Sequence, residues 1–181
     1  MTQFEFISVF ASIILGLGLA HLLTGAIQQL YRGQIDYVQT CYALVALLLI
    51  VLNWWGLFAW KDEGAWSLTQ FFVLVLWSLA MFAVCVAVYP FGETGQQEFE
   101  THRRVVLIAV AGVGVLDIVQ TALHGALFTP VYYLPFVLHF VALALAAAVI
   151  RNALAQKIIA TYFPLTTFFW GFVWTAAAMG G

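Results

Sequence analysis

The chain has 181 residues, of which 65% are hydrophobic and only 8% are charged, and its formal net charge is -2. A composition this apolar lies far outside the range of water-soluble domains and leaves no part of this chain for a soluble catalytic domain. Only six basic residues, spread over several connections, also exclude a nucleic-acid-binding surface. The composition therefore predicts an integral membrane protein.

Six apolar windows follow one another along the chain with short connections between them. A helix needs about 20 mostly apolar residues to cross a bilayer. Windows of about that length lie at 5–23, 40–60, 69–89, 104–124, 131–150 and 158–179. The sequence therefore predicts an all-α membrane protein, a single polytopic domain formed by a six-transmembrane-helix bundle.

The basic residues predict the orientation of this bundle. Lys61 alone lies in the second connection, and the other five lie in the first, third and fifth connections: Arg32, Arg103, Arg104, Arg151 and Lys157. Connections rich in Lys and Arg stay on the cytoplasmic side. Both termini are therefore expected on the external side. The first ten residues lack the basic region of a secretory signal, so no cleaved signal peptide is expected.

The first window carries a small residue at every fourth position. This stripe consists of Ser8, Ser12, Gly16, Ala20 and Thr24. Such a face lets another helix approach closely. That helix belongs either to the same chain or to a second copy in a homo-oligomer.

Polar and aromatic residues meet in the second window, where Asn53 precedes Trp54 and Trp55. The Asn53 amide needs a partner in hydrocarbon, either on a neighbouring helix or in a polar cavity. With the predicted orientation every tryptophan lies in the outer half, as in an interfacial belt. Trp54, Trp55, Trp77 and Trp170 sit deeper than a belt requires. They are candidates to wall a pocket for a lipid tail, a quinone or a cation.

The hairpin of residues 103–151 holds the two ionisable residues that lie well inside apolar windows, Asp117 and His139. Folding it about the turn at 125–130 brings both to one depth, about 20 Å into a layer about 30 Å thick. Ionisable groups at that depth face the protein interior and tend to pair. We therefore expect an Asp117–His139 pair. The pair would either stabilise the hairpin by a hydrogen bond or form the centre of a proton pathway. Histidine suits a proton pathway because its ordinary pKa lies near neutral pH.

A second polar pattern accompanies Asp117. Gln120, Thr121 and His124 follow it at offsets of three, four and seven, so all four share one helical face. Small residues fill 109–114 and 142–148 instead. The pattern predicts a tightly packed inner half and an outer half where polar groups gather, with Glu5 and Asn53 lining an external mouth.

Familiar catalytic and cofactor motifs are missing from the sequence. It has no CxxC, P-loop, nucleophile elbow or HExxH motif, and no metal-ligand spacing. Haem is disfavoured because His124 lies about 12 Å out of step with His139. No cofactor and no metal are therefore expected, a bound lipid or quinone stays open, and an enzyme is the less favoured interpretation.

Three segments carry a resemblance: FEFISVFASIILGLGLAHLLTG at the start, NWWGLFAW in the second window and LDIV in the fourth. They are similar to a family of small bacterial integral-membrane proteins with six expected helices. The resemblance implies a multi-pass protein of the bacterial inner membrane, and no activity follows from it.

These observations support two predictions of function. The first is a small ion- or proton-conducting channel or transporter with Asp117, His139, Glu5, Asn53 and His124 along its pathway. The alternative is a protein that binds a lipophile, or an accessory or scaffold subunit of a membrane complex. The expected partners are membrane lipids and further copies of the chain.

Overall fold

The computed structural model describes residues 2–61, 65–91 and 96–179, and all of their side chains except those of 59, 96–98, 100–101 and 174–179. Throughout these ranges the regular structure is helical, without a strand. The six α-helices are α1 (Gln3–Arg32), α2 (Tyr37–Leu57), α3 (Leu68–Val88), α4 (Gln96–Leu123), α5 (Tyr133–Val149) and α6 (Ala153–Met179), and a 3-10 turn, η1 (Phe58–Trp60), extends α2. The predicted all-α fold is confirmed.

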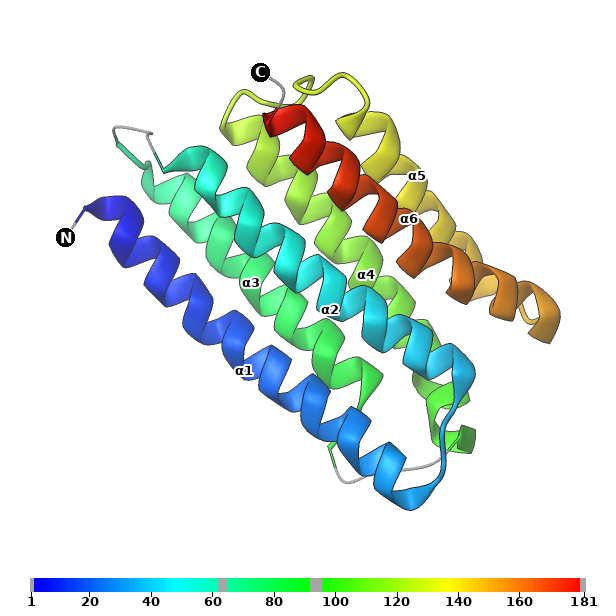
Figure 1. Ribbon diagram of the computed structural model, residues 1–181. Helices are drawn as coiled ribbons and strands as arrows, with labels where there is room; N and C mark the ends of the chain where they lie inside the picture. The colour runs from blue at the N-terminus through cyan, green and yellow to red at the C-terminus, as the bar shows by residue number, and fades with distance from the viewer. Residues whose placement is uncertain (1, 62–64, 92–95, 180–181) are drawn as a thin grey trace.

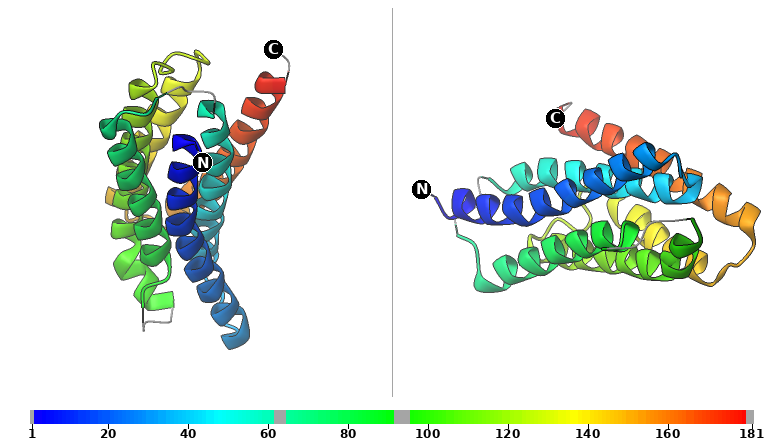
Figure 2. Two further views of the ribbon diagram at one scale, coloured as in Figure 1. Left: turned by 90° about the vertical axis from the view of Figure 1, so that its left-hand side faces the viewer. Right: turned by 90° about the horizontal axis from the view of Figure 1, so that it is seen from below.

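The helices run up and down along one common direction, so that α1 begins and α6 finishes at the same end of the bundle (Figure 1). They form two layers, with α1, α2 and α6 in one and α3, α4 and α5 in the other (Figure 2). The most extensive packing joins α3 to α4, α4 to α5, α1 to α3 and α2 to α6. Of these four pairs, α1 with α3 joins the two layers, and the other three pack within a layer (Figure 2).

Within the residues that the structure describes, four helices are long and apolar enough to cross a membrane: α1, α2, α3 and the part of α4 from His102 onward. These four agree with the prediction of a membrane protein. The apolar helix α5 has 17 residues, fewer than the 20 or so that a straight crossing needs.

Local signals set where the helices begin and end. Thr2 and Glu5 form a capping box at the start of α1, which satisfies backbone N–H groups that have no partner within the helix. α1 continues past the predicted window to Arg32 and stops at Gly33, whose φ of 65° favours glycine. Asp36 and Ser67 cap the starts of α2 and α3 through their side chains.

α1 packs on α3 through glycines outside the predicted stripe. A Cβ atom at Gly25 would lie 2.3 Å from the Tyr89 ring, and one at Gly18 would lie 3.4 Å from Cys85 Sγ. Gly16, in contrast, has nothing within 4 Å of a Cβ position. Within the stripe, Ser12 accepts a hydrogen bond from the Trp54 indole of α2. The close approach of α1 therefore uses a different face, and self-association through the stripe stays a prediction.

Candidate functional site

A cavity of about 110 Å³ lies between the two layers. It occupies the half of the bundle that contains the end of α2, the start of α3, the end of α4, the start of α5 and the later part of α6. Aliphatic and aromatic side chains form most of its wall. The polar residues among those described are Asn53, Asp117, Gln120, Thr121, Tyr133 and Thr167.

Asp117 is held by the first turn of α5. Tyr133 Oη lies 2.7 Å from Asp117 Oδ2 and donates to it. The same hydroxyl lies 2.8 Å from Thr121 Oγ1. A phenol has one proton to give, so Tyr133 donates to the carboxylate and accepts from Thr121. Tyr133 thus holds the carboxylate at the wall of the cavity, and Thr121 holds Tyr133.

The expected pairing of Asp117 with His139 is wrong. His139 is exposed on the outer side of α5, and its Nε2 lies 2.9 Å from Tyr162 Oη of α6. The hairpin places both residues at a similar depth, but His139 lies about 120° around the helix from Tyr133, which faces inward. Rotation of α5 about its axis, which depth alone does not determine, decides that the two side chains point in different directions.

The predicted polar face of α4 is confirmed. Asp117, Gln120 and Thr121 all line the cavity. One turn further on, His124 Nε2 lies 2.9 Å from the Gln120 side-chain nitrogen, and its ring stacks on Trp60 at 4.1 Å. The face therefore leads from the carboxylate toward the end of the bundle at which α1 begins.

His124 lies within a compact aromatic group at that end. Besides Trp60, the edge of Trp66 approaches its ring at 4.9 Å. Its Nδ1 lies 3.4 Å from the Gln70 side-chain nitrogen. Trp60 and Gln120 both line the cavity, so this group borders the end of the space next to the α2–α3 connection.

Three of the four tryptophans singled out in the sequence line the cavity: Trp55, Trp77 and Trp170. Trp170 also stacks on Phe136 of α5, with ring centres 4.5 Å apart and planes 10° from parallel. Trp54 instead donates to Ser12 Oγ at 2.9 Å on the outer side of α2. A helix turns consecutive residues about 100° apart, which separates Trp54 from Trp55.

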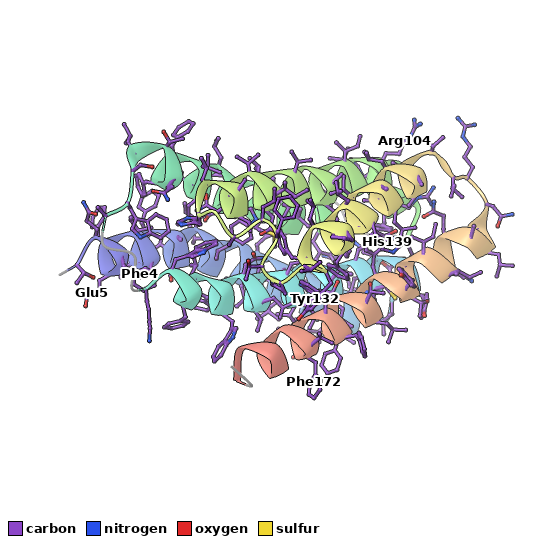
Figure 3. All side chains as sticks on the ribbon, turned by 90° about the horizontal axis from the view of Figure 1, so that it is seen from above. Phe4, Glu5, Arg104, Tyr132, His139 and Phe172 are labelled. Atoms are coloured by element: carbon purple, nitrogen blue, oxygen red, sulfur yellow. The ribbon has the colours of Figure 1, made fainter. Side chains whose placement is uncertain are left out.

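Asn53 and Glu5 have different positions. Asn53 lines the cavity, as one interpretation proposed, although its amide nitrogen donates to Leu49 O of its own helix at 2.7 Å. Glu5 is exposed at the beginning of α1, far from His139 (Figure 3). Its carboxylate accepts from the Thr2 backbone at 2.8 Å. The described cavity wall comes from α2 to α6, so Glu5 lines no mouth of this cavity.

Two buried polar atoms in the wall have no hydrogen-bond partner in the part of the chain that the structure describes. They are Trp77 Nε1 and Gln120 Oε1. Each side chain is only 3% exposed. Most buried polar atoms in folded proteins are paired, so this donor and this acceptor are free to bond to a molecule in the cavity.

Tyr133, Trp60 and Gly56 were missed from the sequence, although all three line the cavity. Tyr133 had a usable signal, because the folded hairpin places it opposite the residues beside Thr121. Trp60 resembled a headgroup anchor in a polar turn. Gly56 gave no signal, since a glycine inside an apolar helix is usually a packing residue.

Opposite the aromatic group the cavity ends against packed apolar side chains. Val110 and Phe140 line its inner end. Beyond them Leu107, Ala144 and Ala147 are completely buried. The inner half is packed at these residues as expected, but polar side chains are not confined to the other half, since Gln39 and Gln156 are buried near the inner end. The core borders the inner end of the cavity.

The fold and the cavity define a class: an all-helical protein with four helices able to cross a membrane and an internal cavity built around one carboxylate. The described residues contain no group of three His, Cys, Asp or Glu side chains that could hold a metal ion. The chain matches no protein-family model, no curated protein and no solved structure.

Proposed function

We propose that the protein binds a small molecule with an apolar body and a polar group inside the membrane, either as a carrier or as a subunit of a larger complex. The observation that carries this proposal is the Asp117 cavity, with Trp77 Nε1 and Gln120 Oε1 buried and unpaired in its wall. A mostly apolar wall with a few convergent polar groups is typical of small-molecule sites.

The volume limits what fits. A cavity of about 150 Å³ lined by aliphatic and aromatic side chains binds benzene. The space of about 110 Å³ here is somewhat smaller. It suits a head group or a single small ring rather than a whole lipid or quinone, so any long tail would have to lie outside the cavity.

We place the exit toward the surrounding lipid between α5 and α6, because these helices pack on each other much less than α4 and α5 do. Trp170 of α6 covers this side by stacking on Phe136. An amphiphile could therefore keep its polar group beside Asp117 and its tail between these two helices.

Two glycines provide a direct test. Gly56 lines the cavity and Gly112 does not, and neither has an atom within 4 Å of a Cβ position. Gly56→Leu therefore fills the cavity, whereas Gly112→Leu is the matched control. Native mass spectrometry after gentle extraction should show a retained small molecule on the wild type and on Gly112→Leu, and none on Gly56→Leu. Retention by Gly56→Leu, or a bare wild type, would contradict the proposal.

A proton or cation pathway is the second candidate, and the polar face of α4 favours it. The bonds from Asp117 to Tyr133 and from Gln120 to His124 extend polar groups from the cavity to the end of the bundle. The packed inner half argues against a continuous channel in this conformation. In proteoliposomes, pH-driven flux that Asp117→Asn abolishes would establish the pathway, and flux equal to that of empty liposomes would exclude it.

The membrane setting is also part of the proposal: six crossings, both termini outside, in a bacterial inner membrane, with the chain in a homo-oligomer. In its support, the connections that carry Arg32, Arg151 and the start of α4 gather at one end of the bundle (Figure 1). Arg104 Nε donates to Ala148 O there at 3.0 Å. Labelling of single cysteines placed in the connections, from either side of intact cells, tests this orientation.

A further inference from the structure

We infer that the ligand of the Asp117 cavity is a small organic cation, an ammonium group that carries apolar substituents. This inference rests on the proposed function and names its class of ligand. The charges in the wall of the cavity are its starting point.

Asp117 is the only acid among the described lining residues, and no Lys, Arg or His belongs to that lining. One carboxylate oxygen accepts from Tyr133. Among the described residues none donates to the other oxygen, Oδ1. A desolvated carboxylate is costly unless an opposite charge or further hydrogen bonds compensate it. A cation in the cavity would supply that compensation.

The aromatic wall suits the same ligand. Four indole rings line the cavity, those of Trp55, Trp60, Trp77 and Trp170. The negative face of an aromatic ring attracts cations, most strongly for tryptophan and more strongly in a desolvated site. A site for a merely apolar ligand would need no carboxylate, and a site for an anion would need a basic group.

The unpaired atoms add one detail about the substituents. Trp77 Nε1 can only donate and Gln120 Oε1 can only accept. A hydroxyl group both donates and accepts, so a hydroxyl on the cation can bond to either atom. Choline, a trimethylammonium group with a hydroxyethyl arm, combines these features and serves as the probe.

The experiment compares choline with 3,3-dimethyl-1-butanol, in which carbon replaces the charged nitrogen and the shape stays the same. Isothermal titration calorimetry on the full chain in an uncharged maltoside detergent should show choline binding about tenfold or more tightly than the alcohol. Asp117→Asn removes the charge and keeps a hydrogen-bond acceptor for Tyr133. It should bring the two affinities close together.

Glu5→Gln is the matched control, because it removes a carboxylate that lies outside the cavity at the same end of the bundle. It should leave the preference for choline unchanged. Trp55→Leu is a second variant at a half-exposed side chain, where folding tolerates the change. It keeps an apolar wall but removes one ring face, so the ratio of the choline affinity to the alcohol affinity should fall severalfold.

The outcomes separate the two proposals. Equal affinities for choline and the alcohol, unaffected by Asp117→Asn and abolished by Gly56→Leu, would overturn the cation inference and leave the binding function standing. No binding of either probe, together with a wild type that retains no molecule in native mass spectrometry, would overturn both.

Discussion

The two halves of the bundle are built from the same helices but pack differently. In the half near the α5–α6 connection, small and aliphatic side chains such as Val106, Ala147 and Ala160 are completely buried. In the other half, large rings line the cavity, among them Trp77 and Trp170. The large rings surround an open space, whereas small and aliphatic side chains fill the other half. The half near the α5–α6 connection therefore supplies most of the packed core, and the other half contains the cavity.

Truncation of a core ring should have the largest effect. Phe163 is completely buried and its ring meets Phe140 edge to face at 4.5 Å. Phe163→Ala should lower the free energy of unfolding by about 3–5 kcal/mol, as measured by SDS titration in mixed micelles. Phe168→Ala, at an exposed position of the same helix, is the control and should change it by about 0.5 kcal/mol or less. Equal losses would mean that the half near the α5–α6 connection is not the stabilising one.

Loss of the Tyr133 hydroxyl should come next. Tyr133→Phe leaves Asp117 without its donor and should cost about 1.5–3 kcal/mol if the carboxylate is charged. The double variant with Asp117→Leu should recover much of that cost, since neither polar partner then remains. The same unfolding titration measures both variants. Additive losses in the double variant would show that the two side chains do not interact.

Overpacking between α4 and α5 should have a slightly smaller effect. A Cβ atom at Gly114 would lie 2.5 Å from Val141 Cγ2, so Gly114→Ala should cost about 1–3 kcal/mol. Gly112→Ala has open space around it and should be neutral or stabilising by up to about 1 kcal/mol. Val141→Ala, combined with Gly114→Ala, should restore stability. If both glycine variants behave alike, the two helices do not meet at Gly114.

Removal of the His139 imidazole should have the smallest effect. The side chain is exposed, and among the described residues its hydrogen bond and its ring contact are both with Tyr162. Polar contacts between membrane helices contribute about 0.6 kcal/mol on average, so His139→Ala should cost less than about 1 kcal/mol. Breaking a buried Asp117–His139 ion pair would instead cost about 3–5 kcal/mol. A loss of about 3–5 kcal/mol on His139→Ala would indicate that Asp117 and His139 do form an ion pair, contrary to the structure.

The sequence by itself determined the helices and their order. Long apolar windows set the number of helices but not all of their ends, since α1 continues past its predicted window to Arg32. It also determined the polar face of α4, because one helix carries Asp117 and His124 with its own period of 3.6 residues. These features depend on the spacing of residues along the chain, which the sequence gives directly.

Only the tertiary structure decided what these faces meet. Whether Asp117 is bound by Tyr133 or His139 depends on the rotation of α5, and whether Trp54 or Trp55 lines the cavity depends on the rotation of α2. Apolar helices have little amphipathic contrast, so their sequences scarcely favour one rotation over another. Steric fit between helices, as at Gly114 and Val141, selects the rotation, and that fit exists only once the helices are assembled.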